Sequence, residues 1–261
     1  MKSMKSRLWP IAPSVLAILT GVIAGLGISK GAIAADHLNL EEGLPAEVED
    51  AYPLGFGGFE FQGVFHYDRV EGEDIFTLDP RLEWGFARNW QAKLSVPVVL
   101  GSEENDIGDI SAEVFYNFNT ETLSTPAIAL SASADFPTGS DSEGIDPTLK
   151  LLVTKSIGTG NNLDRLHLNL GWTYNSEQQD NERQNALSVA LGYSRRLGSE
   201  TILVSDIVFE QEKEEDAEIY LIELGVRHQL SPLNVLAIGA GVGLGEESPD
   251  LRITAGFQQS F

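Results

Sequence analysis

The sequence has no cysteine, two methionines and far fewer basic than acidic residues. Without cysteine, the chain can form no disulfide, no thiolate metal site and no cysteine nucleophile. Lysine and arginine number 17 against 39 aspartate and glutamate residues, and the net charge of −22 argues against binding to nucleic acid or to anionic surfaces. No window shows a sustained helical period. The mean hydropathy of −0.07 is also too low for a helical membrane protein.

The first 34 residues have the pattern of an export signal. Lys2, Lys5 and Arg7 form a basic start, residues 8–28 are apolar, and residues 32–34 give a small-x-small pattern. We expect residues 1–34 to be a cleaved signal peptide, so that the mature chain begins near Ala35. The alternative is an uncleaved anchor, because the apolar run approaches the length of a membrane-spanning helix.

The rest of the chain reads as a short lead-in followed by strands. Residues 35–58 are acidic, contain Pro45 and Pro53 and show no clear period, so we expect a periplasmic N-terminal lead-in. From residue 59 to residue 261 the sequence predicts an all-β domain of about twelve strands. The expected strands are 59–67, 74–87, 89–101, 108–119, 125–136, 146–156, 164–175, 184–196, 200–211, 217–229, 233–245 and 250–261.

Most of these segments alternate between apolar and polar residues. In the last one, Leu251, Ile253 and Phe257 fall on one side and Arg252 and Thr254 on the other, as strand geometry requires. Most segments approach the ~9–11 residues that a tilted membrane strand needs. The least certain segment is 200–211, where either face could be apolar.

The connections and the aromatic residues distinguish a membrane barrel from a secreted β-sandwich. Some connections are tight, and those on the other side are mostly longer and acidic. Aromatic residues fall in two bands, one near each end of the strands: Trp84, Phe86, Trp90, Tyr116, Phe118, Tyr193 and Phe261, and Phe76, Phe136, Trp172, Tyr174, Phe209 and Tyr220. We therefore predict a transmembrane antiparallel up-and-down β-barrel with short periplasmic turns and longer acidic outer loops.

Several short motifs are similar to those of one family. They are Gly108-Asp109-Ile110 leading to Tyr116-Asn117-Phe118, Phe136-Pro137-Thr138-Gly139, residues 167–171 (HLNLG), and the last strand with Gly256 and Phe261. They resemble the outer-membrane β-barrel family named for the MetA pathway of phenol degradation, over essentially the whole mature chain. The resemblance implies a location in the outer membrane and a role in transport. It also implies that Phe261 is the signal read by the barrel-assembly machinery.

Charged residues on the polar faces of the strands are the candidates for function. The candidate lumen-lining residues are Arg81, Glu83, Lys93, Asp109, Glu113, Lys150, Arg165, His167, Glu210, Glu223, Arg227 and Arg252. Such a lining could select solutes, as pore-lining charges do in channels. Alternatively, opposite charges could pair and fill the lumen, because twelve strands lie between barrels filled by side chains and barrels with open water channels.

We expect no catalytic residue, no metal site and no cofactor. His167 and Asn169 share an inward face, but no nucleophile or oxyanion donor is evident beside them, and only an inward Ser–His contact would revive an enzyme. The histidines show no metal-ligand spacing, and the acidic loops lack an ordered Ca²⁺-loop pattern. The Phe136-Pro137-Thr138-Gly139 motif marks an exit turn, with a gate as the alternative.

The sequence thus predicts an outer-membrane channel or transporter for small solutes, including hydrophobic or aromatic compounds as the family name suggests. The alternative is a structural barrel with a filled lumen, and an enzyme comes third. The expected partners are outer-membrane lipids, the barrel-assembly machinery and small-molecule solutes, without nucleic acid. We expect a monomer, since a closed barrel leaves no free sheet edge.

Overall fold

The computed structural model describes residues 35–100, 106–140, 143–157, 163–245 and 247–261. The expected signal peptide, and the acidic loop residues at 103–105, 141 and 246, lie outside the described residues. None of the residues described forms a helix long and apolar enough to span a membrane.

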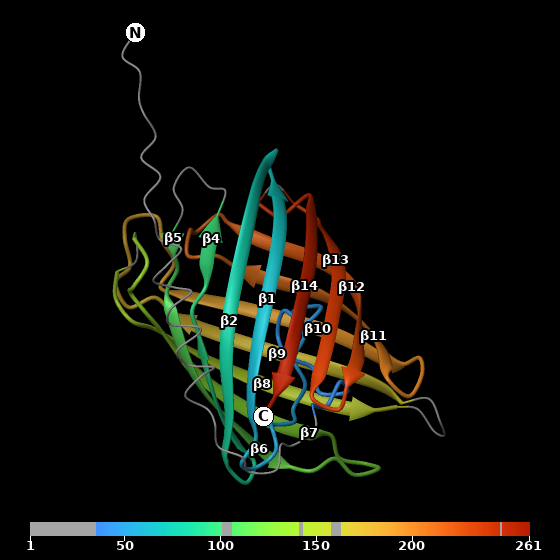
Figure 1. Ribbon diagram of the computed structural model, residues 1–261. Helices are drawn as coiled ribbons and strands as arrows, with labels where there is room; N and C mark the ends of the chain where they lie inside the picture. Colours follow the sequence, from blue (N-terminus) through green and yellow to red (C-terminus); the bar gives the residue numbers. More distant parts are fainter. Residues whose placement is uncertain (1–34, 101–105, 141–142, 158–162, 246) are drawn as a thin grey trace. The chain divides into compact units, whose positions relative to one another are not determined.

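Within the described residues, fourteen strand segments form one antiparallel sheet (Figure 1). The segments are β1 (Phe59–Val70), β2 (Glu73–Ala87), β3 (Trp90–Ser95), β4 (Val98–Leu100), β5 (Asp106–Ile107), β6 (Ile110–Asn119), β7 (Ala127–Phe136), β8 (Asp146–Ser156), β9 (Asp164–Tyr174), β10 (Asn185–Arg196), β11 (Thr201–Gln211), β12 (Glu218–Ser231), β13 (Asn234–Gly243) and β14 (Leu251–Ser260).

The sheet closes on itself. β1 pairs with β2 on one side and with β14 on the other, where Glu60 lies opposite Ser260 and Arg69 opposite Leu251. Both β3 and β4 pair with β2, and β6 and β5 lie opposite them. The fourteen described segments therefore make twelve strands of a closed antiparallel barrel, which confirms the predicted fold class.

Proline explains why one of the twelve strands is interrupted. Pro97 lies between β3 and β4, and its ring removes the N–H that a strand ladder needs at that position. The partner strand is interrupted opposite, where the Gly108 N–H donates to the Pro97 carbonyl at 2.9 Å. A Cβ on Gly108 would lie 3.0 Å from the Pro97 ring, so a side chain would crowd this crossing.

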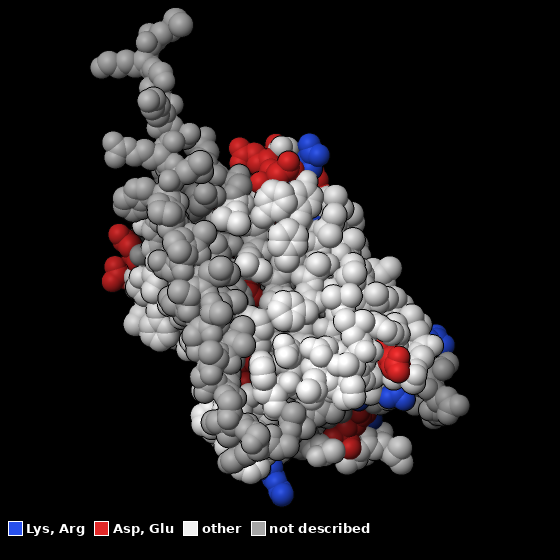
Figure 2. All heavy atoms as spheres, viewed as in Figure 1, with Lys and Arg blue, Asp and Glu red and all other residues white. Residues whose placement is uncertain are grey.

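The two faces of the wall differ as the alternation predicts. On β14, Ile253 and Phe257 are exposed on the outer face, whereas Thr254 and Gln258 are buried on the inner face. The face shown in Figure 2 carries its charged side chains mainly toward the two ends. Such an apolar outer band suits hydrocarbon, and closure of the sheet pairs the backbone groups of neighbouring strands with one another.

Aromatic residues form bands at both ends of the barrel. At the end that carries the C-terminus, Trp90 packs against Tyr116 at a centroid distance of 4.5 Å, and Tyr116 packs against Phe118 at 5.0 Å. At the other end, Phe209 and Tyr220 lie 5.1 Å apart. We call these the termini end and the loop end. Aromatic rings favour the boundary between hydrocarbon and headgroups.

The lengths of the connections differ less between the two ends than the sequence suggests. At the loop end, β1 and β2 are joined only by Glu71 and Gly72, both with positive φ. At the termini end, Asn89 (φ 66°) makes an equally tight turn, but residues 120–126 form a longer connection between β6 and β7.

Candidate functional site: the barrel lumen and the segment inside it

Residues 35–58, which we call the N-terminal segment, lie against the inner wall of the barrel (Figure 1, blue). The sequence predicts a lead-in that precedes the barrel, and the structure adds that this lead-in occupies the lumen. Leu44, Val48 and Ala51 are at most 2% exposed. The segment contains no helix, and its only bridge pairs Glu41 with Leu44.

Main-chain N–H groups of the segment donate hydrogen bonds to side chains of the wall. These side chains come from five strands, so the acceptors surround the segment. The bonds are Glu47 to Glu223 (3.0 Å), Val48 to Asp206 (2.8 Å), Glu49 to Asn169 (2.8 Å), Ala51 to Thr154 (3.0 Å) and Leu54 to Gln91 (2.6 Å). A buried N–H must find a partner, and here side chains of the wall replace the ladder of a strand.

Wall side chains also donate hydrogen bonds to carbonyl groups of the segment. The donors are Gln229 to Ala35 (2.9 Å), Arg165 to Leu38 (3.0 Å), Arg81 to Glu42, Arg227 to Leu44 (3.0 Å), Asn169 to Glu49 (2.8 Å) and Asn117 to Ala51 (2.6 Å). Asn169 therefore binds both the N–H and the carbonyl of Glu49. The wall recognises the main chain of the segment in both directions.

Inward-facing glycines provide recesses for side chains of the segment. A Cβ on Gly192 would lie 2.6 Å from the methyl groups of Val48, and its three nearest neighbours all belong to that side chain. A Cβ on Gly225 would lie 2.6 Å from the Pro45 ring, and one on Gly256 would meet Leu44. These positions have no side chain because the segment fills the space.

Apolar residues of the segment pack on inward residues of β10 to β12. Leu40, Ala46 and Val48 form one buried cluster with Ala190, Ile202, Val204, Val208 and Leu221. On the other side of the lumen, Ala51 packs with Phe115 and Leu152 of β6 and β8. In residues 200–211 either face could be apolar by sequence, and this packing explains why: the inner face of β11 contacts the segment.

Charged residues hold the segment on the side of β2, β3, β6 and β8. Lys150 Nζ lies 2.8 Å from Glu42 and 3.3 Å from Glu49, and Lys93 lies 3.2 Å from Glu113. Burial disfavours the charged form of Glu42, but Lys150 and Lys93 outweigh it and lower the pKa of this carboxyl to about 2. An acid with so low a pKa stays ionised, and the ion pair persists, throughout the physiological range.

Arg252 joins the segment to the seam between β1 and β14. Its guanidinium contacts Asp68 through Nε at 2.7 Å and Nη2 at 3.1 Å, and Glu47 of the segment through Nη1 at 2.7 Å. Such a planar, multidentate contact fixes orientation as well as charge. Arg81 makes a similar link, since it pairs with Asp79 at 2.6 Å and donates to the segment.

The remaining predicted lumen residues differ in their surroundings. Glu83 and Arg227 are almost fully buried, and neither Glu83 oxygen has a hydrogen-bond partner among the described residues. Glu210 is inward but exposed to the cavity at the loop end. Asp109 lies at the rim, where it accepts hydrogen bonds from the Thr138 and Gly139 N–H groups. A role of these residues in solute passage stays a prediction.

A cavity lies on each side of the segment. The loop-end cavity has a volume of 350 Å³ and is lined by Glu42 of the segment together with Arg81, Lys93, Lys150 and Glu210. The termini-end cavity has a volume of 410 Å³ and is lined by Asp36, Asn39 and residues 52–55 of the segment, with Arg165 and Glu60 of the wall. The segment therefore lies between two polar spaces.

His167 contacts an inward-facing serine, and such a contact is the observation that would support an enzymatic function. Its Nε2 lies 2.9 Å from Ser194 Oγ, and its Nδ1 lies 3.1 Å from Thr154 Oγ1, which already accepts the Ala51 N–H. Two tautomers satisfy these contacts. In one, Thr154 donates to Nδ1 and Nε2–H donates to Ser194; in the other, Nδ1–H donates to Thr154 and Ser194 donates to Nε2, which is the arrangement that a general base toward a serine requires. His167 is a cross-strand link beneath the segment.

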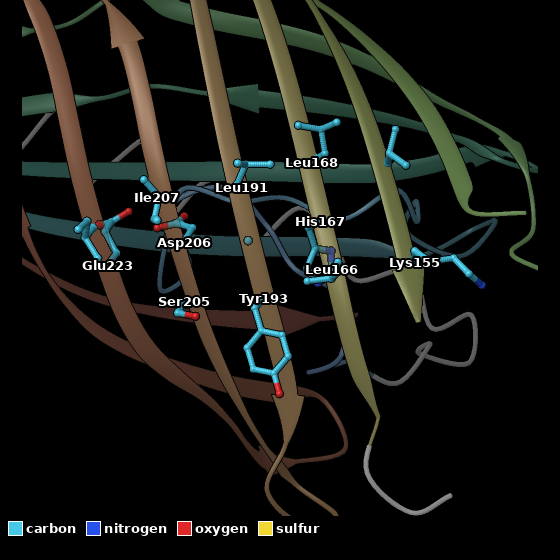
Figure 3. Close-up of a pocket in the computed structure, with 13 residues that line it drawn as sticks. Lys155, Leu166, His167, Leu168, Leu191, Tyr193, Ser205, Asp206, Ile207 and Glu223 are labelled. Carbon is cyan, nitrogen blue, oxygen red and sulfur yellow. The ribbon is translucent and has the colours of Figure 1, made fainter. Parts of the chain in front are cut away.

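A shallow depression of 690 Å³ lies on the outer face, over β8 to β12 (Figure 3). Leu166, Leu191 and Ile207 are exposed there, and Tyr193 and Lys155 lie toward one end of their strands. Since this face contacts hydrocarbon, the depression fits lipid chains.

The N-terminal segment is the functional element that sequence reasoning located least well. Its residues show no period, and no local pattern says that a lead-in enters a barrel. Two signals were present: an inner face of β11 with apolar residues, and glycines at the inward positions 192, 225 and 239. Both features indicate that another part of the chain packs against the inner face of the wall.

Residues 93–261 match the family described as "Putative MetA-pathway of phenol degradation". The chain belongs to this family. Among solved structures, it is similar to an outer membrane channel from Pseudomonas putida F1, with 13% identity, a TM-score of 0.61, and coverage of 85% of this chain and 100% of that one. It is also similar to the NanC porin, with 10% identity, a TM-score of 0.57, and coverage of 77% and 98%. At these identities the likeness shows a shared fold, and this family member is an outer-membrane β-barrel.

Proposed function

We propose that the protein is an outer-membrane channel for small solutes and that its N-terminal segment closes the lumen at rest. The position of the segment between the two cavities carries this proposal. A solute that enters from the loop end meets Lys93 and Lys150 of the wall together with Glu42, which belongs to the segment. Passage therefore requires the segment to shift.

The lining of the loop-end cavity favours hydrophilic solutes. Its hydroxyl groups come from Ser95, Ser111, Ser133, Thr148, Thr173 and Ser188. None of the described residues that line it is aromatic. Hydroxyl groups and paired charges bind polar solutes well, whereas a phenol ring would find no aromatic side chain to stack on among these residues. The lining of this cavity therefore gives no support for the phenolic solutes that the family name suggests.

A structural role for a barrel with a filled lumen is the second candidate, because the same buried segment supports it. The barrel closes at its seam, where the Phe261 N–H donates to the Phe59 carbonyl at 2.9 Å. A closed sheet offers no edge for association, which supports a monomer. We also propose that Phe261 is read by the barrel-assembly machinery, as the family resemblance implies.

Conductance of the full mature chain in a planar bilayer tests the channel. We expect the wild type to be mostly closed and Gly192→Ala to open more often, because the added methyl group would overlap Val48. Gly171→Ala is the matched control, since its Cβ would meet Ser188 rather than the segment. If folded Gly192→Ala protein stays as silent as the wild type and the control, a structural barrel is the better conclusion.

A further inference from the structure

Many of the contacts between the wall and the N-terminal segment involve the main chain of the segment, which every peptide shares. Five N–H groups and six carbonyl groups of its main chain are bound by wall side chains. Every polypeptide offers these groups at the same spacing. A wall that only needed filling could be filled by its own side chains, as in narrower barrels.

From these contacts we propose that the lumen is a binding site for peptides without regular secondary structure, and that residues 44–54 occupy it as an intramolecular ligand. The inference rests on the proposed channel function and names a substrate class for it. The acceptors and donors come from β3, β6, β8, β9, β11 and β12, so they surround the ligand rather than extend one sheet edge.

The side-chain contacts define which peptides fit best. Leu44, Pro45 and Val48 occupy the recesses at Gly256, Gly225 and Gly192, which suit apolar residues of moderate size. Ala51 packs against Phe115 and Leu152 without free space, so a small residue is required there.

The basic residues of the lumen add a preference for acidic peptides. Asp50 lies 3.7 Å from Arg165 and Glu49 lies 3.3 Å from Lys150, both in the lumen. Asp206 and Glu223 accept the main-chain N–H groups of Val48 and Glu47. The preferred ligand is an acidic peptide of about the length of the segment, since Glu47 and Glu49 find basic partners in Arg252 and Lys150.

Binding of the synthetic peptide LPAEVEDAYPL, which has the sequence of residues 44–54, tests this proposal. The full chain carries Val48→Asp, which places a carboxylate in the apolar cluster beside Asp206 and loosens the segment while the wall stays native. We expect saturable binding of the fluorescent peptide, at least about tenfold tighter than to the wild type, whose own segment competes at high effective concentration. A scrambled peptide of the same composition should bind more weakly.

A peptide methylated on the main-chain nitrogens that correspond to Val48, Glu49 and Ala51 separates main-chain recognition from adsorption. It keeps every side chain but loses three donors, and we expect its binding to fall by at least about a hundredfold. Equal binding of the methylated and unmethylated peptides, or no saturable binding, would overturn the proposal. Heat-modifiability on gels confirms the fold, and Ala51→Asp replaces Val48→Asp if the latter does not fold.

Conductance of the same variant keeps the two proposals distinct. If Val48→Asp conducts and the peptide closes it again, the peptide occupies the path of solutes. If the variant conducts but neither binds the peptide nor is blocked by it, the channel stands and the peptide site is wrong. If the peptide binds specifically to a variant that never conducts, the peptide site stands and the channel is wrong.

Discussion

The two sides of the lumen hold the same segment by different physical means. On the side of β10 to β13, Leu40, Ala46 and Val48 pack into an apolar cluster, and glycines leave room for the segment. On the side of β2, β3, β6 and β8, Lys150 and Lys93 face the carboxylates Glu42 and Glu49.

The two kinds of contact respond differently to changes in solution conditions. Apolar packing is insensitive to salt and depends on shape, whereas partly exposed ion pairs weaken as salt rises or as a group changes its charge. The apolar side therefore determines where the segment binds, and the ionic side is where conditions can loosen it. Residues on each side can be substituted separately, and the same measurement can report how each substitution affects release of the segment.

The reactivity of a single introduced cysteine provides that measurement. Ala46→Cys would place a single thiol in the buried cluster, because the chain has no cysteine of its own. Its rate of reaction with a maleimide reports how often the segment leaves the wall. Leu123→Cys, in an exposed turn, provides the rate for a thiol that is always accessible.

The largest effect is expected on the apolar side. Val48→Asp should accelerate labelling at position 46 by about a hundredfold or more, because an unpaired carboxylate buried among aliphatic side chains costs about 3 kcal/mol or more. Val48→Ala, which removes two methyl groups but adds no charge, should give about tenfold. Equal rates for the wild type and Val48→Asp would show that the cluster does not hold the segment.

A smaller effect is expected on the ionic side. Lys150→Met removes a cation from Glu42 and Glu49, and both carboxylates belong to the segment. We expect labelling to accelerate about tenfold, because Glu49 loses a partner in a buried position whereas Glu42 is partly exposed and is less affected. The triple variant with Glu42→Gln and Glu49→Gln should recover much of the loss. If the triple variant labels as fast as Lys150→Met alone, unpaired charge is not the cause.

Lowering the pH should stabilise docking of the segment on the wall, because Asp50 becomes protonated. This buried carboxylate accepts the N–H groups of Leu40 and Tyr52, and burial raises its pKa to about 7 although Arg165 opposes the shift. In a released segment the same group ionises near pH ~3.9. Its contribution to docking is therefore complete below about pH 4 and is lost as the pH rises through about 7.

Labelling at position 46, relative to position 123, measures this dependence. It should be about tenfold faster at pH 8 than at pH 6. Asp50→Asn, which cannot ionise, should make the profile less steep, and the remaining slope should come from Glu41 and Glu49, whose pKa values burial also raises. Glu42 does not interfere, because its pKa of about 2 lies below this range. A profile that stays steep in Asp50→Asn would assign the pH dependence to another group.

The same contrast explains what the sequence could predict. Twelve strands and the outward face of β14 follow from alternation, because lipid on one side imposes a strict period of two. The inner face obeys no such rule where it contacts the segment. Ile202, Val204 and Val208 are apolar inside, and Gly192 has no side chain at all. Contacts between residues far apart in sequence determined this arrangement, so a periodic pattern could not show it.

The smallest effect is expected at the loop-end rim, which belongs to neither side. Thr138 Oγ1 accepts the Ile110 N–H at 2.9 Å and donates to the Gly108 carbonyl at 3.1 Å, so two motifs of the sequence are tied together as a turn. Thr138→Val should lower stability in urea by about 1 kcal/mol, as expected for a few exposed hydrogen bonds, and leave labelling at position 46 unchanged. Faster labelling in Thr138→Val, matching Lys150→Met, would instead make this turn part of the gate. The lumen would then be controlled from its rim as well as from its two walls.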